Sequence, residues 1–251
     1  MSQNAQLFAG DLYISFETAP GVFGPAVLIR TDLLSVTTPS TKKQKKSKNR
    51  SDYGQAFVSI QLAEPTEFAI TFNEMTRSLL AVQLSGELEA LTVVGGAFAD
   101  LPVTAALDGW VDIGRKNIAV ADLAIKNSAG TTTYVKGTDY EINHRLGKLR
   151  AIPGGAITAA QALLASGTAV ATTGTRINGA RKYQHAMKIE GDLQNLANGA
   201  DVEFLAPRAV VTSDQAFDFL QGDIAELKLK GTLEVPSVGV PPFVVEERVE
   251  A

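Results

Sequence analysis

Residues 67–84 read EFAITFNEMTRSLLAVQL, and this stretch decides the fold class because two periodicities meet in it. Its first six residues, EFAITF, alternate apolar side chains with polar or small ones, which is the period of a β-strand with one buried face. The alternation places Phe68, Ile70 and Phe72 inward and leaves Glu67 and Thr71 on the opposite face. The stretch therefore opens with a half-buried strand.

The rest of the stretch has the spacing of an amphipathic helix. Apolar residues recur at intervals of three or four, and Asn73 before them is a residue type that favours the N-cap. Gly86 follows as the predicted C-terminal stop. We predict a helix over residues 73–84 that flanks the sheet. The side chains expected to pack onto the sheet are Met75, Leu79 and Leu80.

Further strands are predicted on both sides of this stretch, so the fold class is mainly β. The longer ones are expected at Leu12–Phe16, Ala26–Arg30, Phe57–Leu62, Ala186–Leu193, Asp201–Leu205 and Ala225–Val235. Between them the texture changes to short apolar stretches broken by Gly, Asp and Asn, which is typical of a compact β-rich subdomain. The short stretches are Val103–Ala105, Trp110–Ile113, Ile118–Ala124, Thr132–Val135, Tyr140–Asn143, Lys148–Ile152 and Ala169–Thr173.

The strand pattern predicts a discontinuous domain organisation. Residues 1–95 and 179–251 are expected to form a β core, and residues 96–178 an inserted β-rich subdomain. Pro236, Pro241 and Pro242 disfavour a central strand near the C-terminus. Residues 236–251 are therefore predicted to form an extended tail.

Residues 37–54, TTPSTKKQKKSKNRSDYG, form the most polar segment of the chain. They bury too little apolar surface to offset the entropy of ordering, so we predict a long loop that is disordered in the isolated chain. Three roles are open: an arm that docks on an acidic surface, a solvated loop, or a nucleic-acid contact without base stacking, since no aromatic residue interleaves the run. The six cations are Lys42, Lys43, Lys45, Lys46, Lys48 and Arg50. Without them the net charge of −4 becomes −10.

Several kinds of chemistry are not expected of this composition. The chain has no Cys and two His, which excludes thiolate sites and leaves too few imidazoles for an ordinary zinc site. The common nucleophile, phosphate-loop and dinucleotide motifs are absent. Asp139, Tyr140 and His144 could form an acid–base group, but the turn residues around them favour a structural role. We therefore expect neither an enzyme nor a cofactor.

The chain is also expected to be a soluble protein made in a cytoplasm. No apolar run approaches the roughly 20 residues that cross a bilayer, and residues 1–10 lack the pattern of a signal peptide.

Four segments in this order resemble the major tail tube proteins of long-tailed, siphophage-type bacteriophages. They are LFAGDLYISF (7–16), KKSKNRSDYGQAFVSIQLAEPTEFAITFNEMTRSLLAVQLSG (45–86), KIEGDLQNLANGADVEFLAPRAVV (188–211) and the closing ELKLKGTLEV (226–235). A further segment, TTYVKGTDYEINHRLGKLRAIPGGAI (132–157), is similar to a β-rich element of phage tail proteins. The resemblance spans most of the chain.

The resemblance implies a β-sandwich or rolled-sheet core with one flanking helix. Six copies would form a ring, and stacked rings would build the tail tube that delivers the genome, beside a tape-measure protein and neighbouring tail proteins in the virion. The inserted subdomain would lie outside the tube wall. The alternatives are a tail-terminator or baseplate ring of the same fold, and a β-sandwich module that binds nucleic acid or another macromolecule through residues 42–50.

A tube through which DNA slides needs a lumen that does not retain phosphate, so an acidic or small polar face is expected there. Strand alternation nominates Glu67, Thr71, Glu190 and Asp192 for that face.

Overall fold

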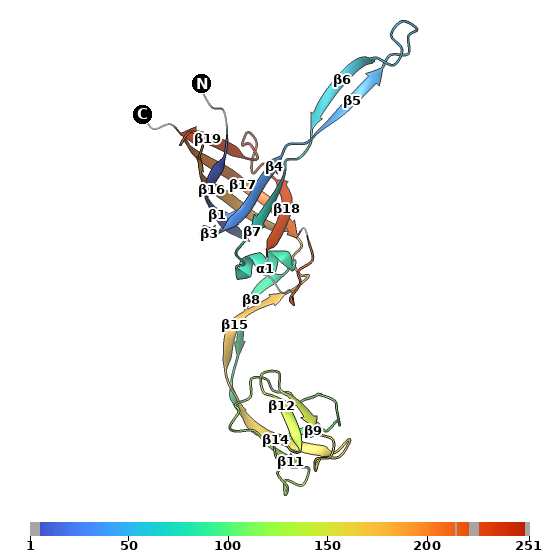
Figure 1. Cartoon of the computed structure of the whole chain (residues 1–251), viewed down its shortest axis with the longest axis vertical. Coiled ribbons are helices and arrows are strands. Elements are labelled where there is room, and N and C mark those ends of the chain that lie inside the picture. The colour runs from blue at the N-terminus through green and yellow to red at the C-terminus, as the bar shows by residue number, and fades with distance from the viewer. Residues whose placement is uncertain (1–5, 214, 221–225, 249–251) are drawn as a thin grey trace. The chain divides into compact units, whose positions relative to one another are not determined.

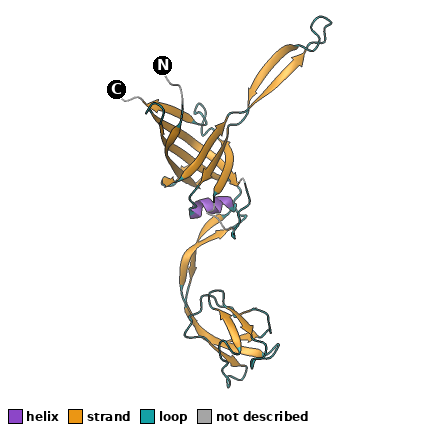
Figure 2. Cartoon of the chain, in the orientation of Figure 1, coloured by secondary structure: helices purple, strands orange, loops and turns teal. Residues whose placement is uncertain are grey.

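The computed structural model describes residues 6–213, 215–220 and 226–248. Strands dominate these residues, with one short helix, α1 (Arg77–Gln83), among them (Figure 2). The mainly β class predicted from the sequence is confirmed. The chain divides into two compact units: unit 1 holds Met1–Leu88 and Ile177–Ala251, and unit 2 holds Glu89–Arg176.

The two unit borders cut through a two-stranded ribbon rather than a loop. Strand β8 (Glu87–Val93) pairs with β15 (Thr172–Asn178), and each strand begins in one unit and ends in the other. The borders drawn from the sequence, at 95/96 and 178/179, fall on the C-terminal side of both structural borders, since composition does not show where a continuous strand passes between units.

Nine strands of unit 1 form one antiparallel sheet in the order β2-β1-β16-β17-β18-β7-β4, with β3 paired to β1 and β19 paired to β17 (Figure 1). Their bounds are β1 Phe8–Ala19, β2 Val22–Phe23, β3 Val27–Ile29, β4 Thr31–Thr37, β7 Glu67–Phe72, β16 His185–Asn195, β17 Asp201–Ser213, β18 Leu227–Leu233 and β19 Val244–Arg248.

This sheet is curled. Strands β3 and β4 lie toward its opposite ends, yet only Arg30 separates them in the chain. The two Cα–Cα steps from Ile29 to Thr31 cover at most about 7 Å. The sheet therefore has to roll until these two strands approach each other.

The inward side chains of the sheet pack together with α1 in one core. The alternation read from EFAITF holds for Phe68, Ile70 and Phe72, which are 3%, 1% and 0% exposed. The buried core residues are Leu12, Ile14, Ile29, Phe68, Ile70, Phe72, Leu79, Val82, Met187, Ile189, Phe204, Ala206, Ala209, Val211, Leu227, Leu229 and Leu233.

Helix α1 is shorter than the sequence predicted. Its N-cap is Thr76, whose Oγ1 accepts a hydrogen bond from the Leu79 amide at 3.2 Å, and Asn73 lies outside the helix. At the other end Ser85, at φ +47°, occupies the left-handed position, so Gly86 is not the residue that turns the chain. The Gly86 amide donates to the Ala81 carbonyl at 2.7 Å, which completes a Schellman cap.

The face that α1 presents to the core differs slightly from the predicted one. Leu79 is fully buried and Met75 packs against the core, as expected. Val82, one helical turn after Leu79, joins the core, whereas Leu80 is only half-buried. A step of one residue turns a helix by about 100°, so Leu80 lies to the side of the packing face.

The polar segment 37–54 is not one long loop, and this prediction was wrong. Ser40–Lys46 forms strand β5, which pairs antiparallel with β6 (Ala56–Ala63). All residues of both strands are exposed. Ladder hydrogen bonds order the backbone although the side chains stay exposed, and composition alone does not report such bonds.

The predicted C-terminal tail is also partly wrong. Val244–Arg248 forms β19, which pairs with Asp201–Leu205 of β17. Strand β18 pairs with Ala209–Ser213 farther along the same side of β17, so β19 and β18 lie end to end. The three prolines lie before β19 in the chain. They therefore do not remove any backbone N–H group from the hydrogen bonds between β19 and β17.

Unit 2 contains two three-stranded antiparallel sheets, β10-β13-β12 and β11-β14-β9. Their bounds are β9 Gly96–Thr104, β10 Val111–Asp112, β11 Ala124–Asn127, β12 Tyr140–Asn143, β13 Lys148–Ala151 and β14 Ala162–Ala169. The core residues are Phe98, Val103, Ala105, Ile113, Ile118, Ile125, Tyr134, Tyr140, Leu149, Ala151, Ile157, Leu163 and Ala165. The β-rich character predicted for this region is confirmed.

Two strands predicted in unit 2 do not form. Apart from Ala124, which begins β11, Ile118–Ala124 and Thr132–Val135 contain isolated bridges only, such as that between Ile118 and Ala169. Ile118 and Tyr134 are nevertheless buried at 3% and 7% exposure. The apolar residues there fill the core from loops, which a short apolar run cannot distinguish from a strand.

Candidate assembly surface

The β5–β6 hairpin sorts its cations between two faces. Directly paired residues of an antiparallel ladder share a face, and Lys43 pairs with Ile60, Lys45 with Val58, and Thr41 with Leu62. This amphipathic face carries a lysine stripe, Lys43 and Lys45, beside an aliphatic stripe, Val58, Ile60 and Leu62. The aliphatic side chains are 42%, 53% and 42% exposed.

The opposite face of the hairpin is polar. Lys42 pairs with Gln61 and Gln44 with Ser59. The extra residue of the bulge near the tip lies on β6, so β5 stays regular and Lys46 shares the face of Lys42.

The remaining two cations, Lys48 and Arg50, lie in a closed turn at the tip. The Ser47 hydroxyl donates to Asp52 Oδ1 at 2.8 Å and accepts from the Asn49 amide at 3.2 Å. Ser47 is only 8% exposed, which is unusual in this hairpin. The tip therefore has local order of its own.

A second charged surface lies on the outer face of the unit 1 sheet, which is the face opposite its core. Asp11 pairs with Asp192, Asp192 with Glu203, and Glu203 with Glu246, so one carboxylate row crosses β1, β16, β17 and β19. All four residues are exposed. Like charges directly opposite each other destabilise a sheet, so this row has an energetic cost.

The carboxylate row is only partly neutralised. Arg248 bonds Glu203 and lies 3.8 Å from Glu246, whereas Asp11 and Asp192 form no ion pair with any described residue. Of these four residues, the sequence pattern had predicted only Asp192 as a functional residue, for a lumen face. Alternation placed each of them on one face of its own strand, and only the pairing register aligns them in one row.

An apolar row runs beside the carboxylate row, two residues along each strand. Leu28 pairs with Tyr13, Tyr13 with Glu190, Glu190 with Leu205, and Leu205 with Val244. Glu190 interrupts the row, and its Oε1 lies 2.5 Å from Lys188 Nζ. A hollow of about 430 Å³ lies over this region, lined among others by Tyr13, Glu190, Asp192 and Glu203.

The structure separates the four residues nominated for a lumen. Glu190 and Asp192 lie on β16, whereas Glu67 and Thr71 lie on β7, three strands away in the sheet. Glu67 is exposed between Thr37 and Thr232. Thr71 is only 7% exposed, so its predicted exposure was wrong: its short side chain lies between those of Leu33 and Lys228 on the flanking strands.

The possible acid–base residues of unit 2 are engaged in structural contacts. Asp139 accepts hydrogen bonds from the Val135 and Ala156 amides at 2.8 and 2.9 Å, and these bonds lower the pKa of its carboxyl. Tyr140 is 3% exposed, and burial raises the pKa of its hydroxyl. His144 lies in a turn, with its Nε2 2.9 Å from Lys136 Nζ. Burial of the imidazole, and then the positive charge of Lys136, lower the pKa of His144. Asp139 thus joins two loop segments.

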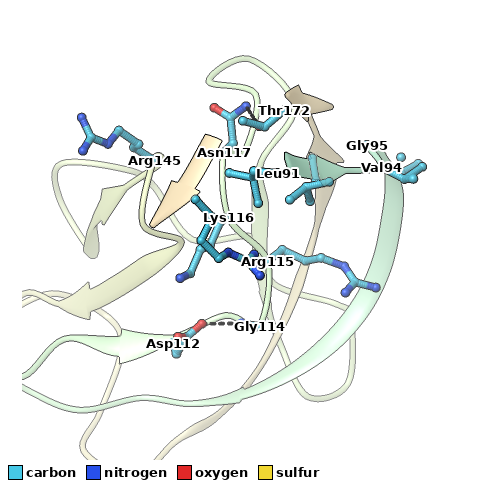
Figure 3. Close-up of a pocket in the computed structure, with 15 residues that line it drawn as sticks. Leu91, Val94, Gly95, Asp112, Gly114, Arg115, Lys116, Asn117, Arg145 and Thr172 are labelled. Atoms are coloured by element: carbon cyan, nitrogen blue, oxygen red, sulfur yellow. Dashed lines mark hydrogen bonds between the residues drawn. The ribbon is translucent and has the colours of Figure 1, made fainter. Parts of the chain in front are cut away.

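Unit 2 also has a cavity of about 960 Å³ with a positive lining (Figure 3). Arg115 and Lys116 come from one loop, and Arg145 comes from a turn. The Asn117 amide donates a hydrogen bond to the Arg145 carbonyl at 3.1 Å and so joins the loop to the turn. Gly147 lets these segments approach, since a Cβ there would lie 1.6 Å from the Arg115 oxygen. Asp112, the one carboxylate in the lining, accepts from the Gly114 amide at 2.7 Å. Such a lining favours anions.

The described residues contain neither a metal-binding cluster nor a membrane-spanning helix. No group of three or more His, Cys, Asp or Glu side chains there is arranged to hold a metal ion. None of the helical structure in that part of the chain is long and apolar enough to cross a membrane.

Comparison with known proteins gives one family. The match extends over residues 30–237, which include the β5–β6 hairpin, all of unit 2 and most of the curled sheet. A search of curated proteins found no match. Because the matched stretch covers most of its length, the chain belongs to the family described as Protein of unknown function UCP028589.

Proposed function

We propose that this chain is a structural protein that assembles with copies of itself, and that its assembly is the stacked hexameric ring of a siphophage-type tail tube. The observation that carries the proposal is the β5–β6 hairpin, whose aliphatic stripe of Val58, Ile60 and Leu62 stays exposed within the chain. An isolated two-stranded hairpin is at best marginally stable in water. A partner surface would supply the missing burial.

The sheet edges support assembly as well. Strand β4 ends the strand order and pairs only with β7 among the described residues, which leaves one row of backbone groups for another chain. Free edges attract further strands, and a closed ring of subunits satisfies them without open-ended aggregation. The hexameric number itself comes from the resemblance of the sequence to tail tube proteins.

In the tube, the chain would contact its own copies, a tape-measure protein and neighbouring tail proteins, and DNA would pass without specific binding. Glu67, between Thr37 and Thr232, is the residue we retain for the lumen, because that part of the outer face is small and polar. Unit 2 would lie outside the tube wall. A tail-terminator or baseplate ring would use the same contacts without extended stacking.

A second candidate function has one observation in its favour. The cationic run has no aromatic residue, but Tyr53 and Phe57 in the same hairpin are 77% and 74% exposed. Cations beside exposed rings can hold single-stranded nucleic acid by phosphate contact and base stacking. The hairpin could thus serve a binding module.

Electron microscopy and sedimentation velocity of the purified full chain test the proposal. Rings or tubes with six subunits per layer are the expected result, and a monomer at every concentration would reject it. Fluorescence anisotropy with a labelled oligonucleotide tests the second function. The binding module would be favoured if the chain stays monomeric and its affinity for the oligonucleotide falls steeply as the salt concentration rises.

A further inference from the structure

The amphipathic face of the hairpin and the outer face of the sheet carry matching patterns. On the hairpin, the lysine stripe (Lys43, Lys45) runs beside the aliphatic stripe (Val58, Ile60, Leu62). On the sheet, the carboxylate row (Asp11, Asp192, Glu203, Glu246) runs beside the apolar row. Each pattern is an apolar line next to a charged line, and the two charges are opposite.

Both patterns reach the surface of the chain, although Tyr13, Leu205 and Val244 of the apolar row are half-buried. The aliphatic stripe is about half exposed, Leu28 of the apolar row is 49% exposed, and the four carboxylates are exposed. The hairpin lysines form no ion pair with any described residue. Neither surface has therefore found its partner inside one copy of unit 1.

We propose that the hairpin of one copy lies across the outer face of β1, β16, β17 and β19 of a second copy. Lys43 and Lys45 then contact the carboxylate row, and the aliphatic stripe covers Tyr13, Leu205 and their neighbours in the apolar row. This docking surface rests on the proposed function, because it supplies the contact by which that assembly forms.

The dimensions of the two patterns agree. Neighbouring strands are about 4.8 Å apart, so four carboxylates on four strands span about 14 Å. Residues on one strand rise about 3.4 Å each, so Val58 to Leu62 also spans about 14 Å. The hairpin therefore has to run across the sheet strands rather than along them.

Electrostatics explains why the sheet retains a costly row. Asp11 and Asp192 face each other without a counter-ion among the described residues, and two lysines from outside would turn this repulsion into attraction. The hollow of about 430 Å³ beside Asp192 and Glu203 gives space for a long lysine side chain. A face covered in this way does not line a lumen, so Glu190 and Asp192 are reassigned from the lumen to the docking surface.

Cross-linking between two single variants tests the contact directly. Because the chain has no cysteine of its own, only the introduced cysteines can react. Ile60→Cys protein is mixed with Leu205→Cys protein and treated with a short bis-maleimide. A cross-linked heterodimer is expected. Ser59→Cys lies one residue away on the polar face of β6 and serves as the matched control with Leu205→Cys. Equal cross-linking of both pairs would overturn the proposal.

Charge reversal provides the second arm. Lys43→Glu with Lys45→Glu should raise the concentration needed for assembly by about tenfold or more, since like charges then meet at the contact. Lys42→Glu with Lys46→Glu makes the same charge change on the polar face and should have a much smaller effect. Adding Asp192→Lys and Glu203→Lys to the first variant should restore assembly. Equal effects of the two reversals, or no restoration, would contradict the docking surface.

The two arms separate this inference from the proposed function. If the wild-type chain forms tubes but the Lys43/Lys45 reversal assembles normally, the docking surface is wrong and the structural function stands. If the wild-type chain forms no ring yet Ile60→Cys and Leu205→Cys cross-link selectively, the contact stands and the tube is wrong.

Discussion

The β5–β6 hairpin of unit 1 and the β12–β13 hairpin of unit 2 use the same antiparallel ladder but differ in what covers them. In the second hairpin Tyr140, Leu149 and Ala151 are at most 3% exposed and belong to the core of unit 2. In the first, all residues of both strands are exposed. The β12–β13 hairpin forms part of the core of its own unit, whereas the β5–β6 hairpin leaves its side chains exposed for contact with another molecule.

Deleting each hairpin in turn should give the largest difference between them, in assembly and in melting temperature. Replacing residues 40–63 with Asn-Gly should abolish assembly, while the melting temperature of the remaining chain stays unchanged. The Glu64 amide already donates to the Pro39 carbonyl at 3.0 Å, so the shorter turn has a closed base. Removing residues 140–151 should instead unfold unit 2. Electron microscopy and calorimetry measure the two outcomes, and tubes formed without residues 40–63 would break the comparison.

Single truncations should show the same contrast in stability. Leu149 is fully buried, so Leu149→Ala should cost about 2 to 5 kcal/mol of unfolding free energy. Ile60 is 53% exposed, so Ile60→Ala should stay within about 0.5 kcal/mol in the unassembled chain. Urea unfolding of the two variants checks both values. Similar losses at the two positions would mean that the hairpin is already covered in the isolated chain.

Acid should affect the second hairpin's unit through Asp139. Its folded pKa lies below the ordinary value of 3.8, so the charged carboxylate stabilises unit 2 above that pH. The contribution is lost as the pH falls through the folded pKa. Asp139→Asn should therefore lower stability at neutral pH, and the gap to wild type should narrow below about pH 4. Thermal melts from pH 7 to pH 3 test this, and a constant gap would exclude the carboxylate charge as the cause.

The smallest effect is expected at the tip of the β5–β6 hairpin. Ser47→Ala removes the bonds to Asp52 and Asn49, which should increase amide exchange locally in residues 47–55. The global melting temperature should not change. Hydrogen exchange resolves the two regions, and faster exchange in β12–β13 would contradict the independence of the hairpins.

The sequence predicted these two hairpins unequally well. Tyr140–Asn143 was predicted with the bounds of β12, because turn residues on both sides delimit an alternating run. Strand β5 was predicted as a loop, because its lysines have no side-chain signal for a strand and its order comes from backbone bonds to β6. The exposure of β6 could not be predicted from the sequence. Its alternating pattern is the same whether its apolar side is covered by its own unit, by another chain or by solvent.

The docking surface was predictable only in part. Composition showed a cationic segment on an otherwise acidic chain, which favoured an acidic partner surface. Which acids form that surface depends on the register of four strands that are far apart in the chain. Asp11 and Glu246 are separated by almost the whole chain, so no local pattern connects them.

The β8–β15 ribbon has a consequence for engineering. The chain leaves unit 1 at Leu88 and returns at Ile177 on two strands that pair with each other, so the two ends are about one strand spacing apart. A foreign domain with adjacent termini could therefore replace Glu89–Arg176 without stretching either strand. The ribbon is thus a graft point at which a reporter enzyme or an epitope could take the place of unit 2.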